Sequence, residues 1–202
     1  MKKYLVPTAI LAVVSALFVW VAIAAPARTA ASNLEAVNSL TAGKTTEAEL
    51  LGRKAFQSAP RMCIQETCFY HLEAQNRFLS ALHLAPRTFI GTNVSVRGGL
   101  VQDVAVFSMT AGLRPVIILQ VESLPHDCQE NPCLKLPPAN QLAGLRIIVD
   151  HQSEVRNHLP DAVNVQCLSR PRGCTQYAEF VPLTRDFQFE ETSSGLKLRG
   201  RK

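Results

Sequence analysis

The chain lacks the short motifs that identify the commonest enzyme chemistries. It has no Cys-x-x-Cys pair, which argues against thiol–disulfide catalysis, and no serine in a Gly-x-Ser-x-Gly turn. None of its five histidines stands in His-Glu-x-x-His or a comparable ligand spacing. Gly43-Lys44-Thr45 lacks the earlier glycine of a phosphate-binding loop. These absences predict a protein without a catalytic constellation, a cofactor or a metal.

Two cysteine and histidine patterns come closest to a metal or catalytic site. Cys63, Cys68 and His71 give Cys-x4-Cys-x2-His, which differs from the established spacings of zinc ligands. His126-Asp127-Cys128 is contiguous, but Cys128 has an obvious disulfide partner five positions further on. We therefore expect neither pattern to bind a metal or to catalyse a reaction.

Asp150 and His151 are the remaining candidates for a site. They directly follow the apolar run Leu145–Val149, and the ends of strands often present functional groups. The alternative is that this pair forms a solvated turn.

The chain also has little net charge outside its two ends. The formal charge is +5, but Lys2, Lys3 and four residues of the last six are basic. Without these six residues, 15 basic side chains face 16 acidic ones, which leaves a charge of −1. A basic nucleic-acid-binding surface is therefore not expected. We interpret residues 186–202 as a polar, basic and frayed tail, with contact to anionic lipid or wall polymer as the alternative.

An apolar run of 22 residues, Tyr4–Ala25, is the strongest positive feature of the sequence. As a helix it would be about 33 Å long, enough to cross the hydrocarbon core of a bilayer. It predicts an uncleaved signal anchor over residues 1–25. Ala22-Ile23-Ala24 also resembles a cleavage site for a signal peptide, so a secreted, cleaved form stays open as the alternative.

The orientation is the same in both cases. Lys2 and Lys3 precede the apolar run and favour the cytoplasmic side, so the rest of the chain lies across the membrane, in a periplasmic or extracellular space. The expected partners are the lipid bilayer and an envelope protein.

Six cysteines agree with an oxidising compartment. An even number of cysteines in an exported chain predicts disulfides, and six cysteines allow 15 pairings. Close pairs offer the simplest solution, in which each bridge closes a small loop and pins it. The three candidate pairs are Cys63 and Cys68, Cys128 and Cys133, and Cys167 and Cys174.

The pattern of apolar residues predicts one α+β domain over residues 40–185, behind a linker at 26–39. Alternating runs at Phe89–Arg97, Leu100–Met109 and Val116–Val121 predict an antiparallel meander, with Gly98-Gly99 as its first turn. Leu145–Val149 adds a fourth strand. We expect about four or five antiparallel strands, with one or two helices on one face and disulfide-stapled loops.

Three helical segments are expected from local signals. Thr45 or Thr46 can cap a short helix, and Glu49, three residues after Thr46, would close a capping box. Apolar residues between Cys68 and Leu84 have partly helical spacing, which Pro86 ends. A helical turn is also expected at Ser153–His158.

The segment Leu40–Gly52 (LTAGKTTEAELLG) resembles the signature of the SmpA/OmlA-type small outer-membrane-assembly lipoproteins. The matching residues are Gly43, Thr45, Leu51 and Gly52. The resemblance covers residues 40–121 and implies two helices before a three-stranded antiparallel sheet, with a scaffolding or assembly role and no catalysis. The chain departs from the family because it has no lipobox cysteine and carries a cysteine-bearing region at 123–175.

These observations predict a non-enzymatic module for interaction or assembly in the cell envelope. A ligand-binding or sensor ectodomain is the alternative, which an apolar pocket with convergent polar groups between sheet and helix would favour. An unrecognised secreted hydrolase is a second alternative, and it requires a histidine brought together with a carboxylate or a cysteine.

Overall fold

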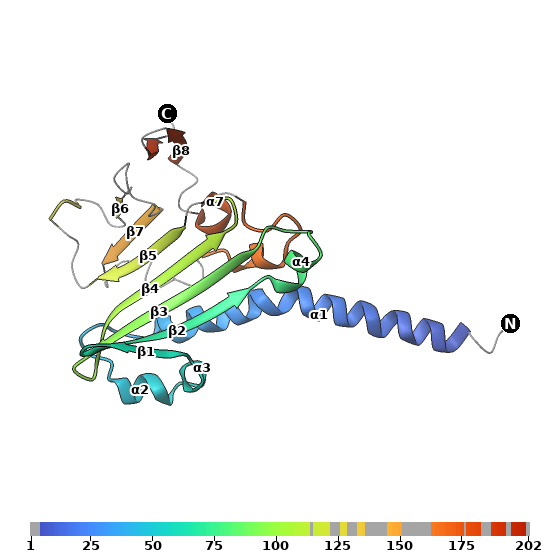
Figure 1. Ribbon diagram of the computed structural model, residues 1–202, viewed down its shortest axis with the longest axis horizontal. Helices are drawn as coiled ribbons and strands as arrows, with labels where there is room; N and C mark the ends of the chain where they lie inside the picture. The colour runs from blue at the N-terminus through green and yellow to red at the C-terminus, as the bar shows by residue number, and fades with distance from the viewer. Residues whose placement is uncertain are drawn as a thin grey trace.

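The computed structural model describes residues 5–113, 115–121, 126–128, 133–135, 145–150, 163–175, 177–182, 187–192 and 195–200. The chain is an α+β protein, as predicted, with a seven-stranded sheet and a long N-terminal helix (Figure 1). The helical elements are α1 (Leu5–Asn38), α2 (Glu47–Gly52), α3 (Lys54–Gln57), α4 (Arg77–Ala81), the 3-10 helix η2 (Val165–Ser169) and α7 (Tyr177–Phe180). The strands are β1 (Arg61–Ile64), β2 (Thr67–Gln75), β3 (Thr88–Arg97), β4 (Leu100–Thr110), β5 (Val116–Val121), β6 (Cys133–Lys135), β7 (Leu145–Asp150), β8 (Phe187–Thr192) and β9 (Gly195–Gly200).

The predicted meander is confirmed as β3, β4 and β5, which pair antiparallel in sequence order. Gly98 and Gly99 form the first turn, and both have the positive φ that a tight hairpin turn needs (60° and 77°). Alternation identified these strands because each has one face in the core.

The sheet has more strands than expected, and one of its pairings is parallel. Its order is β1-β2-β3-β4-β5-β7-β6, with β7 parallel to β5 and β6 antiparallel to β7. The strand predicted at Leu145–Val149 is therefore present, but the expectation of a wholly antiparallel sheet is wrong. Short strands such as β6, three residues long, carry too little periodicity to be predicted.

The helix expected between Cys68 and Leu84 is largely wrong. Residues 67–75 form β2, in which Tyr70, Leu72 and Ala74 are buried at every second position. The short helix α4 then follows. The apolar spacing of three in this segment arises from two adjacent elements and not from one helix.

The predicted linker at 26–39 is also wrong, because α1 runs without interruption through it. Ala27, Ala30, Leu34 and Val37 are buried at helical spacing and belong to the hydrophobic core. Alanines here indicate close packing of the helix on the sheet. The preceding part of α1 is apolar and exposed from Ile10 to Val21, and it projects from the domain (Figure 1).

The short helix α2 is held to the sheet at the far end from the start of α1. The predicted capping box is confirmed, with Thr46 accepting from the Glu49 N–H and the Glu49 carboxylate accepting from the Thr46 N–H. The hydroxyl of buried Tyr70 donates to Glu47, and Arg61 Nη2 lies 2.8 Å from the same carboxylate oxygen. Burial and the Glu47 carboxylate together raise the pKa of Tyr70.

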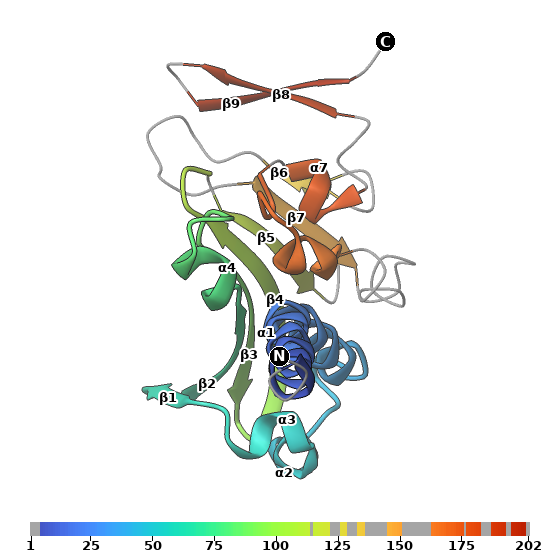
Figure 2. The ribbon, with the colours of Figure 1, turned by 90° about the vertical axis from the view of Figure 1, so that its right-hand side faces the viewer.

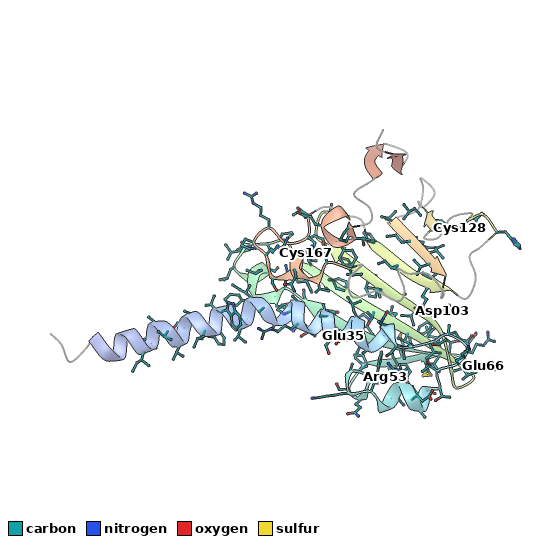
Figure 3. The ribbon with its side chains drawn as sticks, turned by 180° about the vertical axis from the view of Figure 1, so that it is seen from behind. Glu35, Arg53, Glu66, Asp103, Cys128 and Cys167 are labelled. Carbon is teal, nitrogen blue, oxygen red and sulfur yellow. A yellow bond between two sulfur atoms is a disulfide. The ribbon has the colours of Figure 1, made fainter. Side chains whose placement is uncertain are left out.

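All six cysteines form the disulfides predicted from their spacing: Cys63–Cys68, Cys128–Cys133 and Cys167–Cys174. The first joins directly opposed residues of the β1–β2 hairpin. The third joins Cys167 of η2 to Cys174; both cysteines are buried and belong to the core (Figure 3). Each bridge closes a short loop.

The C-terminal segment contains regular structure where we expected a frayed tail. Strands β8 and β9 pair antiparallel as a separate two-stranded sheet, from Phe187 opposite Gly200 to Thr192 opposite Gly195. The predicted helical turn at Ser153–His158 lies outside the described residues.

Candidate functional site

The sequence candidates Asp150 and His151 stay a prediction, because the side chains of both lie outside the described residues. Asp150 is the last residue of β7 and lies opposite Val121 of β5 through its backbone. Among the residues that the structure describes, no group of three metal-ligating side chains could hold an ion.

A partly exposed apolar face of the sheet is the most distinctive surface of the molecule. Figure 2 shows α1, η2 and α7 on one side of the sheet, whereas the described elements leave the other side of β3, β4 and β5 open. The residues of β2 to β5 that point to this side come from alternate positions and are half-buried or exposed, apart from Gly91 and Ser95, which are buried. We call this surface the open face; it comprises Phe69, His71, Phe89, Asn93, Ala105, Phe107, Met109, Ile117 and Leu119.

Phe107 is the centre of the open face. Its ring lies edge-on to Phe89, with centroids 5.9 Å apart, and is stacked on His71 at 5.7 Å. Gly91 lies directly opposite Phe107 across the strands, and a Cβ there would be 2.4 Å from the ring. Because Gly91 has no side chain, the Phe107 ring can occupy the space that a Cβ would fill.

His71 connects the open face to a groove on the neighbouring edge of the sheet. Its Nδ1 lies 2.7 Å from Asn93 Oδ1, and its Nε2 lies 3.5 Å from Glu73 Oε2. Both ring nitrogens thus face oxygen atoms, and the ring is held in one orientation between a strand neighbour and a carboxylate. The cluster is half-exposed, so it is available to a bound partner or ligand.

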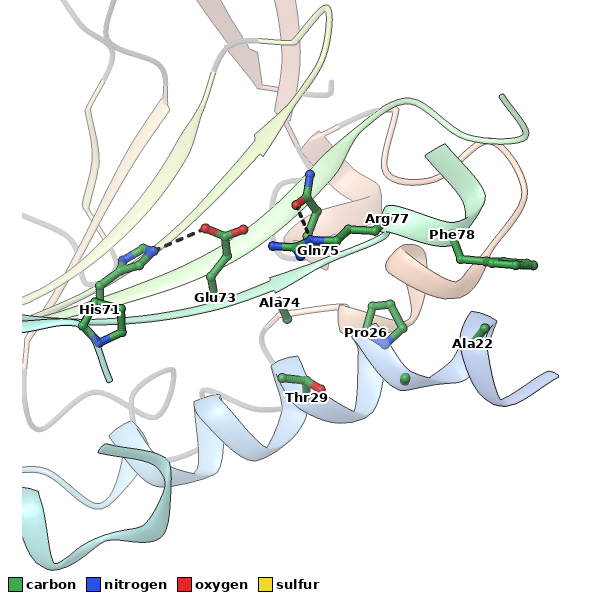
Figure 4. A pocket seen from close by; sticks show the side chains of 11 residues that line it. Ala22, Pro26, Thr29, His71, Glu73, Ala74, Gln75, Arg77 and Phe78 are labelled. Atoms are coloured by element: carbon green, nitrogen blue, oxygen red, sulfur yellow. Dashed lines mark hydrogen bonds and ion pairs between the residues drawn. The ribbon is translucent and has the colours of Figure 1, made fainter. Parts of the chain in front are cut away.

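The groove lies between α1 and the edge of β2 and has a volume of about 550 Å³ (Figure 4). Small residues of α1 form one wall, and β2 with the start of α4 forms the other. Polar groups converge on it from His71, Glu73, Gln75 and Arg77, with Arg77 Nε 3.1 Å from Gln75 Oε1. The lining residues are Ala22, Ala25, Pro26, Thr29, Pro60, His71, Glu73, Ala74, Gln75, Arg77 and Phe78.

The edge of β2 along this groove is open. Strand β1 pairs with β2 only as far as Tyr70, and the His71 N–H then donates to the Pro60 carbonyl at 3.1 Å. Backbone groups of alternate residues point to the same edge, so those of Glu73 and Gln75 also point outward. No strand in the described part of the chain pairs with this stretch, which leaves a strand edge that an extended peptide can join.

His71 is the described histidine that bears on the hydrolase alternative. His71 is brought together with a carboxylate, as hydrolysis would require, but none of its described hydrogen bonds joins it to a serine, threonine or cysteine hydroxyl or thiol. All six cysteines are in disulfides and supply no nucleophile.

Sequence reasoning noticed His71 as a weak zinc ligand and did not identify this site. The signal was the alternation of Phe69, His71, Glu73 and Gln75, which places all four on one side of a strand. This alternation was not recognised, because the apolar residues between Cys68 and Leu84 also have partly helical spacing.

Comparison of the chain with protein-family models, with curated proteins and with solved structures gave no match.

Proposed function

We propose that the protein is a membrane-anchored, non-enzymatic interaction module of the cell envelope, which binds a partner protein through the open face. One observation carries this proposal: apolar side chains of four adjacent strands, β2 to β5, lie on a sheet face that the described elements do not cover. Uncovered apolar patches of this kind are typical of sites for protein–protein contact. Phe107 and Phe89 supply the aromatic anchors that dominate such interfaces.

The anchor part of the proposal rests on the continuity of α1. One helix in the described chain is long and apolar enough to cross a membrane, and it continues directly into the core. Retention of residues 1–25 would therefore hold the domain against the bilayer without a flexible spacer. The three disulfides support an oxidising compartment outside the cytoplasm.

Site-specific photo-crosslinking in the native membrane tests the interaction. A photoreactive phenylalanine analogue is placed at Met109, on the open face, or at Leu51 of α2, a control of similar exposure (45% and 39%). We expect a discrete protein adduct from position 109 that is absent from position 51 and is lost when Phe107→Ala is added. Equal adducts from both positions, or adducts with lipid alone, would contradict a docking role for the open face.

The groove favours a ligand-binding or sensor ectodomain as a second candidate. It lies between sheet and helix and gathers a carboxylate, an imidazole and a guanidinium around small apolar residues. A thermal-shift screen with small carboxylates and phosphates tests it. The shift should be lost in Arg77→Gln and kept in Met109→Ser; a shift that both variants keep would exclude the groove.

The resemblance to SmpA/OmlA-type lipoproteins supports an assembly role within the same proposal. Two matching residues have structural tasks: Gly43 has φ of 71° and donates its N–H to Val101 at 2.7 Å, and Thr45 Oγ1 accepts from the Thr41 N–H at 2.9 Å. Both tasks fix the approach of the chain to α2.

A further inference from the structure

Two loops flank α1 at the end of the domain from which its apolar half projects. The first is α4 with the residues that follow it, up to Arg87, and the second is the loop closed by Cys167–Cys174. Figure 2 looks along α1 from its N-terminus and shows η2 just above the helix in this view, with α4 above it to the left. Figure 1 shows that both lie at the same level along α1.

The two loops are joined into one surface. The Arg172 N–H donates to the Leu84 carbonyl at 2.9 Å, and Gly173 lies beside Ala85 and Pro86. His83, next to Leu84, and Arg172 adopt left-handed backbone conformations (φ 55° and 75°). The disulfide is buried underneath, so the surface has a fixed shape.

The composition of this surface is apolar and basic. Leu82 and Leu84 are 52% and 51% exposed, and Arg87, Arg170 and Arg172 of the same two loops are also exposed. Residues 77–87 and 163–174 contain no aspartate or glutamate. In the described part of the chain, no ion pair engages any of these three arginines.

We propose that this surface rests on an anionic bilayer, the same one that α1 enters. The helix is exposed and apolar as far as Val21, and Ala22 lines the groove together with Phe78 of α4. The bilayer surface therefore meets the domain at the level of α4. Arg28 lies 5.0 Å from the centroid of the Trp20 ring, and this aromatic–basic pair is typical of the lipid headgroup region.

The exposed leucines and arginines of this surface both favour a lipid bilayer as its binding partner. Exposed leucines can enter the headgroup boundary, while the arginines meet phosphate groups at its surface. Each arginine near an anionic surface favours the bound state by roughly fivefold, and the effect falls with salt. The inference rests on the membrane anchoring by α1 that is part of the proposed function. The surface lies apart from the open face, so loss of the lipid contact and loss of the partner contact can be told apart.

Quenching by brominated lipid tests the contact in the full-length chain. The chain carries Trp20→Phe to remove its one native tryptophan, and Leu84→Trp introduces a reporter. Ile64→Trp, at the tip of the β1–β2 hairpin, is the control, because Ile64 and Leu84 have similar exposure (56% and 51%). Each protein is reconstituted as one copy per nanodisc, in brominated phosphatidylcholine alone or with one quarter phosphatidylglycerol.

We expect the Leu84→Trp reporter to be quenched at least about twofold more than the Ile64→Trp reporter in discs with phosphatidylglycerol. Adding Arg87→Gln, Arg170→Gln and Arg172→Gln should reduce this quenching to its level in phosphatidylcholine. Circular dichroism and the unfolding midpoint verify that the triple variant is folded.

Three results would overturn the inference. Equal quenching of the two reporters would show that the surface stands away from the bilayer. If quenching of the Leu84→Trp reporter is the same with and without phosphatidylglycerol, and is unchanged by the three arginine substitutions, recognition of anionic lipid is excluded. If the Leu84→Trp reporter is protected from solvent only in discs that hold two copies of the chain, the surface binds a second copy and not lipid.

Discussion

At the residue scale, Gly91 and Phe107 show how one missing side chain shapes the open face. The Phe107 ring occupies the space where a Cβ of Gly91 would be, 2.4 Å away. Glycine in the middle of a strand is normally unfavourable, so its presence here has a packing reason.

A double-mutant cycle tests this pair. Gly91→Ala should displace the Phe107 ring and lower the free energy of unfolding, whereas Gly91→Ala in a Phe107→Ala background should lower it by about 1 kcal/mol less. Urea unfolding of the four proteins in detergent measures the coupling. Additive effects would show that the ring does not depend on the glycine.

Thr46 and Glu49 give a second prediction at this scale. Thr46→Ala removes the side-chain cap of α2 and should cost about 1 kcal/mol of unfolding free energy. The Thr46 N–H and hydroxyl hold the pKa of the Glu49 carboxyl below its usual range. A lowered folded-state pKa stabilises the fold above the ordinary carboxyl pKa, and this stabilisation is lost as pH falls through the lowered value.

The dependence of stability on pH, measured below neutral pH, tests the coupling between Glu49 protonation and folding. Unfolding midpoints between neutral and acidic pH should fall less steeply in Glu49→Gln than in the unmodified chain. Parallel curves for the two proteins would show that Glu49 is not linked to folding.

At the scale of elements, α1 has two functional halves with different environments. Leu34 is fully buried in the core, and Leu17 is 57% exposed in the apolar half. Leu34→Ala should lower the free energy of unfolding by about 3 kcal/mol, because a cavity replaces packed atoms. Leu17→Ala is the matched control and should leave domain unfolding unchanged in the same detergent; a similar loss in both would contradict this division of the helix.

The disulfides should differ in their contribution by location. Cys63–Cys68 joins exposed Cys63 of β1 to half-buried Cys68 of β2, and its replacement by two alanines should cost about 2 kcal/mol. Cys167 and Cys174 are buried beside η2, so the same change there also leaves unfilled space, and should cost about 4 kcal/mol. Chemical denaturation compares the two variants, and the reverse order would contradict the assignment.

Elements were predictable from sequence where one local signal dominated. The meander followed from alternation and Gly98-Gly99, and the start of α2 followed from Thr46 and Glu49. Prediction failed in β2, where two elements mimicked helical spacing, and at 26–39, where small residues suited both a linker and a tightly packed helix. In both cases tertiary packing decided between local alternatives.

At the scale of the whole molecule, the site was not predictable, because it depends on register. The open face combines residues of strands that are distant in the chain, such as His71, Asn93 and Phe107. The groove depends on where β1 stops pairing with β2 and on α1 crossing beside that edge. Neither the register of these strands nor the end of the β1–β2 pairing is encoded in a local sequence pattern. The cysteine pairs were predictable because each bridge joins residues that are close in the sequence.

The continuity of α1 leads to the last prediction, on the fate of the apolar segment. Its buried half packs against the sheet and its exposed half is long enough to enter a bilayer, so the two halves move as one body. We expect the chain purified from membranes to retain residues 1–25 and to resist extraction by alkaline carbonate. Intact mass with and without reductant should show six cysteines that are alkylated only after reduction, consistent with the three bridges. An N-terminus at Ala25 would contradict the anchor, and the shortened α1 would then hold the core without holding the domain at a membrane.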